Sequence, residues 1–180
     1  MNKNEVTAEL YRQQFAVEVS KRYHAHRIDS IRLWACALQG VELVASTSAL
    51  VSTFAWSVTV TRGLILVAGL SAGLALVKRL ADAEARHHEK KAAFGELSKR
   101  FPADLSTGTE ALLEEVLRER REIEKDDTAG FQCLDVACHN EECFARGLHG
   151  DMQPLTWAQR NLGAILPLRY RPRPAAKPDA

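Results

Sequence analysis

The amino-acid sequence predicts an all-α protein, a two-transmembrane helical hairpin with long cytoplasmic helical extensions and a small C-terminal helical region. Three observations predict this fold class. Residues 33–77 carry only two charged side chains, Glu42 and Arg62, whereas the segments on both sides are dense in charge. Apolar residues recur at helical spacing in both of these flanking segments. Neither proline nor glycine interrupts the chain before Gly40, so a long first helix is expected.

The low-charge stretch of residues 33–77 is too long for one membrane span and fits two spans with a tight connection. About 20 helical residues cross the roughly 30 Å hydrocarbon core of a bilayer. We place the first span at residues 33–53 and the second at 58–77, with Trp56 at the far interface. The alternative is a buried helical hairpin inside a soluble bundle, which the mean hydropathy of −0.21 permits.

Basic residues flank the predicted hairpin on both sides. They are Lys21, Arg22, Arg27 and Arg32 before it, and Lys78, Arg79, Arg86, Lys90 and Lys91 after it. Because cytoplasmic loops of membrane proteins carry an excess of Lys and Arg, both termini are expected in the cytoplasm. The predicted interface anchors are Trp56 and Arg62 on the far side and Lys78 and Arg79 on the near side.

Residues 1–32 are expected to form a cytoplasmic amphipathic helix. Its apolar stripe, spaced at three, four or seven residues, consists of Val6, Leu10, Val17, His24, Ile28 and Ile31. Because no helix breaker follows, this helix is expected to run directly into the first span.

Residues 78–102 are expected to continue the second span as a cytoplasmic helix that ends at Pro102. A coiled-coil-like seam recurs along it at Leu80, Ala83, His87, Lys90, Phe94, Leu97 and Phe101. The polar members make this seam imperfect, and ordinary packing between the two long helices explains both the seam and the N-terminal stripe.

Residues 103–166 are predicted to be a helical C-terminal region. Thr109 is a plausible N-cap for a helix over residues 110–125, whose inward residues are Leu113, Val116, Leu117 and Ile123. A second helix is expected over residues 131–145, ended by Gly147, and a short last helix over residues 155–165. Residues 167–180 are rich in proline and basic side chains, which predicts an extended or disordered tail.

Cysteine and histidine gather in the second of these helices. The weak metal-ligand candidates are Cys133, Cys138, His139 and Cys143. Zinc sites usually bring cysteines in close pairs. These cysteines lie five residues apart, which is about 500° around a helix, so they do not share one face of it. A metal site would need a non-helical backbone here, so buried helical cysteines are the favoured interpretation and no cofactor is expected.

Polar side chains form a stripe on the first span at Gln39, Glu42, Ser46 and Thr53. A carboxylate inside a span is costly unless it faces water or a partner, so assembled hairpins could line a pore with this stripe. Alternatively, Glu42 makes a single interhelical hydrogen bond, or it lies at the interface because the span begins later.

Small residues recur at four-residue spacing in both spans. Ala45 and Ala49 form such a pair in the first span, and Gly69 and Gly73 in the second. Small residues let helices approach closely in lipid, which favours packing within one chain or in a homo-oligomer.

Sequence motifs for catalysis are not found, so an enzyme is not expected. The chain contains no G-x-S-x-G elbow, Walker loop, dinucleotide fingerprint or H-E-x-x-H sequence. With a net charge of +1, nucleic acid is not an expected partner. The basic tail (Arg169, Arg171, Arg173, Lys177) is better suited to solvent or anionic lipid.

The arrangement of a charged N-terminal helix, two close spans, a long following helix and a helical C-terminal part resembles the SLATT family. These are two-transmembrane effector proteins of bacterial conflict systems. The segment CHNEECFARGLHGDMQPLTWAQRNLGAIL, with Trp157 and Arg160, is similar to the end of such proteins. The resemblance implies a pore-forming or membrane-disrupting effector in antiviral defence, located in the bacterial inner membrane. It also implies a trigger from a separately encoded sensor or nucleotide-signal protein.

Two other functions remain open on the sequence. The chain could be a non-conducting membrane anchor whose C-terminal helices recruit a cytoplasmic partner. It could also be a soluble helical-bundle interaction protein.

Overall fold

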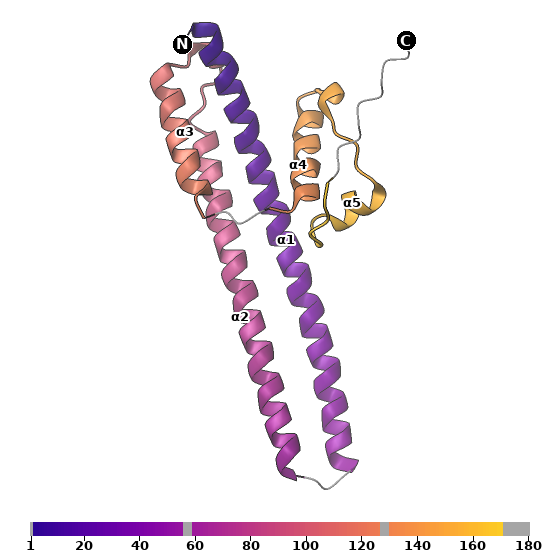
Figure 1. The fold of residues 1–180 in the computed structure, drawn as a ribbon. Helices are drawn as coiled ribbons and strands as arrows, with labels where there is room; N and C mark the ends of the chain where they lie inside the picture. Colours follow the sequence, from indigo (N-terminus) through magenta and orange to yellow (C-terminus); the bar gives the residue numbers. More distant parts are fainter. Residues whose placement is uncertain (1, 56–58, 127–129, 171–180) are drawn as a thin grey trace, which may run out of the picture. The chain divides into compact units, whose positions relative to one another are not determined.

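The computed structural model describes residues 2–55, 59–126 and 130–170, without the side chains of residues 42–55 and 59–72. Every regular element within these ranges is a helix, so the all-α class is confirmed. In chain order the elements are α1 (Lys3–Ala55), α2 (Thr59–Ser98), η1 (Leu105–Thr107), α3 (Glu110–Glu124), α4 (Gln132–Ala145), η2 (His149–Asp151) and α5 (Trp157–Leu162) (Figure 1).

The chain divides into two compact units. Unit 1 comprises Met1–His26 and His88–Ala180, and unit 2 comprises Arg27–His87. The helices α1 and α2 therefore each contribute one end to unit 1 and the remainder to unit 2. The continuity of α1 from Lys3 to Ala55 confirms that no break separates the N-terminal helix from the first predicted span.

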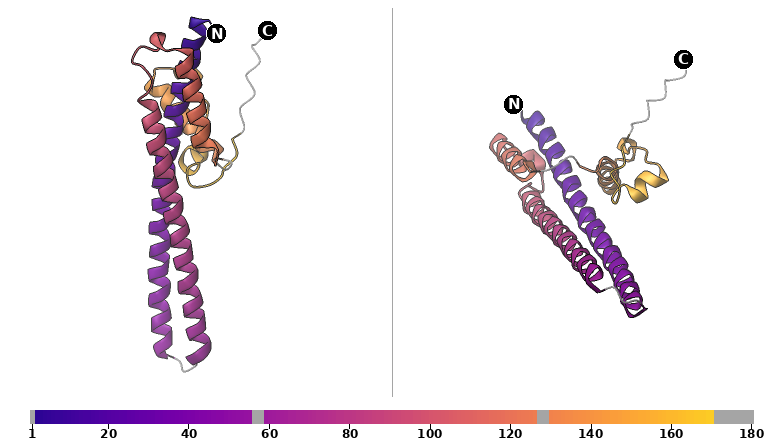
Figure 2. Two further views of the ribbon diagram at one scale, coloured as in Figure 1. Left: turned by 90° about the vertical axis from the view of Figure 1, so that its left-hand side faces the viewer. Right: turned by 60° about the horizontal axis from the view of Figure 1, so that its bottom comes forward.

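Unit 1 is built around a core shared by the start of α1, the end of α2, and α3. These segments lie side by side in Figures 1 and 2. The core consists of Val6, Leu10, Val17, Phe94, Leu97, Phe101, Leu113 and Val116, with Leu117 and Ile123 packed against it. Burying a large apolar side chain contributes about 1.5–3 kcal/mol, so this cluster is the main source of stability in unit 1.

Both apolar patterns predicted for the flanking helices are confirmed. All six residues of the N-terminal stripe are buried, from Val6 to Ile31. The seam on α2 is buried from Phe94 onward and half-buried at its earlier members. In unit 1, the imidazole of His24 stacks on the Phe94 ring with centroids 5.5 Å apart, so the stripe's one histidine serves as a packing residue.

The helix α4 packs on α1 through a second, smaller core in unit 1. Val19, Leu134 and Cys138 are its buried members, and Phe15 and Tyr23 pack against them. The Tyr23 hydroxyl accepts a hydrogen bond from the backbone N–H of Phe131 at 3.1 Å. This bond satisfies a free donor at the start of α4, which has no side-chain cap of its own.

The start of α3 and the end of α4 lie where the local sequence predicts them. The Thr109 hydroxyl accepts from the Leu112 N–H at 3.2 Å, which confirms it as the N-cap of α3. Gly147 has a φ of 72°, and the following N–H closes onto the Cys143 carbonyl at 2.8 Å, so α4 ends as expected.

Two predicted helix boundaries are wrong. The helix α2 ends at Ser98 instead of reaching Pro102, because Pro102 has no N–H to donate to the Ser98 carbonyl and its ring would clash with that carbonyl in a helix. The last helix covers only Trp157–Leu162, not residues 155–165. A capping box between Thr156 and Gln159 fixes its start, and Gly163 follows its last residue.

Unit 2 is a helical hairpin made of the rest of α1 and the first part of α2. The two helices end and begin at Ala55 and Thr59, within two residues of the predicted connection. Arg32 Nε donates to Glu84 Oε1 at 2.7 Å between the two helices. Among the residues that the structure describes, no helix has a stretch both long and apolar enough to cross a membrane. The two-span part of the fold stays a prediction.

Candidate functional site

The predicted intramembrane residues fall mostly outside the described side chains. Of the polar stripe, Gln39 is exposed on α1, whereas the side chains of Glu42, Ser46 and Thr53 are not among those described. Their proposed role in lining a pore therefore stays a prediction.

The side chains of some predicted packing and anchor residues are described, and those of the others are not. Gly73 is half-buried on α2, and Lys78 and Arg79 are exposed one to two turns later. The remaining members, Ala45, Ala49, Trp56, Arg62 and Gly69, lie outside the described side chains. The exposure of Lys78 and Arg79 leaves both cations free to reach solvent or lipid headgroups.

Large apolar side chains are exposed on both helices of unit 2 where its described part ends. On α1 they are Leu33, Trp34 and Val41, which are 56%, 43% and 66% exposed. On α2 they are Leu74 and Leu76, at 72% and 42%. The Arg32–Glu84 ion pair and the Lys78 and Arg79 cations follow on the side away from the hairpin connection. The described residues of the chain leave this apolar surface open, and exposed apolar patches bordered by charge are typical of interaction sites.

A cluster of charged side chains joins α1 to α4 inside unit 1. The Glu142 side chain is only 6% exposed and accepts from both Arg22 Nε at 3.0 Å and Arg146 Nε at 2.6 Å. Glu141 next to it pairs with His26 Nε2 at 3.0 Å. Two guanidinium groups on one carboxylate keep the buried charge compensated, which is the condition for tolerating it.

Arg146 also packs over aromatic rings of α1. Its guanidinium carbon lies 5.0 Å from the Tyr11 ring centroid and 5.4 Å from that of Phe15. Burial opposes its charge, but hydrogen bonds to Glu142 and Tyr11 outweigh burial and raise the pKa of Arg146. This cation therefore holds α4 on α1 through both charge and stacking.

The cysteines of α4 are buried free thiols, as the sequence favoured. Cys133, Cys138 and Cys143 are each at most 1% exposed on a helical backbone. Burial, with the charges of Glu141 and Asp135, raises the pKa of Cys138 to about 12. Burial also raises the pKa values of the other two thiols. At neutral pH these thiols stay protonated and are poor nucleophiles and metal ligands.

His139 lies near one of these thiols without forming a metal site. Its Nε2 is 3.4 Å from the Cys143 sulfur and 3.4 Å from the Asp151 carbonyl oxygen. Within the described ranges, no group of three His, Cys, Asp or Glu side chains is placed to hold a metal ion. The contact between His139 and the Asp151 carbonyl instead ties the segment after α4 back onto that helix.

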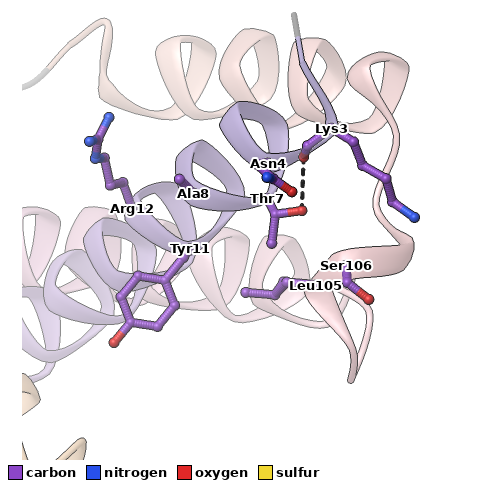
Figure 3. Close-up of a pocket in the computed structure, with 8 residues that line it drawn as sticks. All are labelled: Lys3, Asn4, Thr7, Ala8, Tyr11, Arg12, Leu105 and Ser106. Carbon is purple, nitrogen blue, oxygen red and sulfur yellow. Dashed lines mark hydrogen bonds between the residues drawn. The ribbon is translucent and has the colours of Figure 1, made fainter.

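A broad groove of about 810 Å³ lies along the start of α1, beside η1 (Figure 3). Thr7 and Tyr11 of α1 and Leu105 of η1 line its floor, and the Thr7 hydroxyl donates to the Lys3 carbonyl at 3.0 Å. The Lys3 and Arg12 side chains point away from one another in Figure 3. The lining contains no carboxylate, histidine or cysteine, so the groove offers contact surface instead of an acid–base pair.

The charged cluster between α1 and α4 was not found from the sequence. Arg22 was read only as one of the basic residues before the hairpin, yet its partner Glu142 lies 120 residues away in the sequence. The available signal was the adjacent acidic pair Glu141–Glu142, which lies within a helix that also carries three cysteines.

Comparisons with known proteins give no relative for this chain. No family model matches it, and neither a curated protein nor a solved structure matches it significantly.

Proposed function

We propose that this protein is an oligomeric inner-membrane effector of a bacterial defence system, which opens or disrupts the membrane through its unit 2 hairpin. The exposed apolar surface of the described part of unit 2 supports the proposal most directly. Leu33 and Val41 on one helix and Leu74 on the other expose more than half of their surface. Lipid, or a second copy of the same hairpin, would cover these side chains.

The arrangement of charge supports a membrane boundary at this level of the hairpin. The exposed cations Lys78 and Arg79 directly follow the apolar residues of α2, and Arg32 directly precedes those of α1. Long basic side chains at the ends of a span can extend to the headgroups while their stems remain in the apolar region.

The polar residues predicted within the spans supply the pore-forming part of the proposal. Assembled hairpins would place Gln39 and Glu42 around a common axis, and the small residues around Gly73 would allow close helix contact. Rearrangement of the helices in unit 1, prompted by a separately encoded sensor, would then open the assembly. The resemblance to the SLATT family supports this trigger.

The first test measures membrane insertion and depolarisation together. The wild type is expected in the membrane fraction after an alkaline wash, and its induction should depolarise cells that carry a potential-sensitive dye. Glu42→Leu removes the polar group and Gly73→Leu blocks close packing, so each should lower depolarisation about tenfold while leaving insertion intact.

The matched control is Gly40→Leu, because Gly40 is exposed on α1 and an added side chain there meets no atom within 4 Å. This variant should depolarise like the wild type. Recovery of the wild type in the soluble extract would overturn the membrane proposal. Unchanged depolarisation by the Glu42 and Gly73 variants would overturn the pore and leave a membrane anchor.

A further inference from the structure

A second groove in unit 1 lies between α4, Arg22 of α1 and the segment that follows η2. Its volume is about 480 Å³, within the range of roughly 300–1,000 Å³ usual for binding pockets. Phe144, Met152 and Leu155 supply its apolar walls, and Arg160 of α5 stands at its edge. The proposed membrane activity makes no use of this groove.

The apolar walls of this groove are open to solvent. Phe144 is 67% exposed and Met152 is 40% exposed. Trp157, at 77%, begins the helix that carries Arg160 one turn later. Tryptophan, methionine, phenylalanine and arginine are the side chains enriched at protein interfaces, where a few of them carry most of the binding energy.

Two arginines line the groove, and only one of them pairs with a carboxylate of the described residues. Arg22 is held by Glu142 at 3.0 Å inside unit 1. Arg160 is exposed and forms no ion pair with any residue in the described part of the chain. An incoming carboxylate could take two parallel N–H donors of this guanidinium, which is the strongest geometry for such a pair.

We propose that this groove docks an acidic amphipathic segment of a partner protein. A bulky apolar side chain of the partner enters between Phe144 and Met152, and a neighbouring carboxylate pairs with Arg160. An anionic lipid surface fits less well, because Glu141 lines the groove with a 43% exposed side chain and Asp151 is exposed beside it. A layer of phosphate headgroups would face both of these carboxylates as well as Arg160 and be repelled, whereas a single carboxylate of a peptide needs to approach only Arg160.

This inference goes beyond the proposed membrane activity, because every residue that carries it belongs to unit 1. It holds or fails whether or not the hairpin of unit 2 enters a membrane.

The test selects a displayed library of random short peptides against the full chain in mild detergent. Enriched peptides should combine a bulky apolar residue with Asp or Glu within about one helical turn. Synthetic copies, measured by fluorescence anisotropy, should bind at least about tenfold more weakly to Phe144→Ala and to Arg160→Glu.

The matched controls are Arg118→Glu, an exposed arginine on α3, and Leu166→Ala, an apolar residue 40% exposed outside the groove. Both should leave the affinity within about twofold of the wild type. Failure to enrich such peptides, or enrichment that both groove variants leave unchanged, would overturn the docking site. Binding of anionic vesicles that the groove variants abolish would assign the surface to a membrane instead.

Discussion

The helices α1 and α2 bury most of their large apolar side chains in unit 1 and expose several of them where the described part of unit 2 ends. In unit 1, Leu10 and Leu97 have no exposed surface. In the described part of unit 2, Val41 and Leu74 are 66% and 72% exposed. Within unit 2, α1 is still buried at Ile28 and Ile31, and its exposed large apolar side chains begin at Leu33, which is 56% exposed. Unit 1 thus supplies its own core, whereas this part of unit 2 leaves several large apolar side chains exposed.

The two parts of the chain therefore obtain their stability in different ways. Unit 1 gains it from side chains that the sequence places against one another, and it should keep its fold in any solvent that preserves apolar packing. The described end of unit 2 exposes several of its large apolar side chains, so these residues contribute little packing energy there. Substitutions in the two units should therefore have unequal effects.

The largest expected effect comes from removing a core side chain of unit 1. Leu97→Ala should lower the free energy of unfolding by about 2–5 kcal/mol, because it deletes buried atoms and leaves a cavity. Leu74→Ala makes the same chemical change on the same helix where the side chain is 72% exposed, and should cost less than about 0.5 kcal/mol.

Urea unfolding of the full chain in mild detergent, followed by circular dichroism, measures both values. Equal losses of stability in the two leucine variants would contradict this prediction, because they would show that Leu74 is packed as tightly as Leu97.

The next largest effect is expected from removing a buried carboxylate of unit 1, compared with a more exposed carboxylate of unit 2. Glu142→Gln removes the carboxylate shared by Arg22 and Arg146 and should cost about 3 kcal/mol, near the lower end for breaking a buried ion pair. Glu84→Gln removes the carboxylate that pairs with Arg32 in unit 2. The Arg32 side chain is 56% exposed and that of Glu84 is 29% exposed. That change should cost less than about 1 kcal/mol.

Hydrogen exchange shows where each of these losses acts. Glu142→Gln should speed exchange of the α4 backbone amides in particular, because the carboxylate holds that helix on α1. Protection of α4 equal to that of the wild type would mean that the apolar contacts alone hold it.

Short-range signals account for the features that could be predicted from the sequence. The N-cap at Thr109, the left-handed Gly147 and the buried stripe from Val6 to Ile31 each depend on residues within a few turns of one another. The helical spacing of apolar residues indicates which face of a helix is buried, whichever element covers that face. The stripe was therefore predicted correctly without knowledge of its partners.

Features that depend on long-range register could not be predicted in this way. The Arg22–Glu142 pair joins residues 120 positions apart, and the groove beside Arg160 forms only because the segment after η2 returns to α4. Amino-acid composition and local spacing do not show which residues so far apart in the sequence come into contact. The predicted stripe at Glu42, Ser46 and Thr53 stays untested for a different reason, because those side chains lie outside the described residues.

The smallest effect concerns pH and belongs to unit 1 alone. Because burial raises the pKa of Cys138 to about 12 from an ordinary value of 9.0, the folded state retains a proton that the unfolded chain releases. This contribution to stability is fully present below pH 9 and is lost as the pH rises toward 12. The loss between pH 9 and 10 should be of the order of 1 kcal/mol.

Cys138→Ala isolates this contribution, because other groups that titrate in the same window are common to both proteins. The variant should be less stable than the wild type at pH 8, since it leaves a small cavity, and the gap should narrow as the pH rises. Parallel stability curves for the two proteins from pH 8 to 10 would contradict a raised thiol pKa. They would mean that solvent reaches the thiol in the folded state and that the contact between α1 and α4 is looser than the core of α1, α2 and α3.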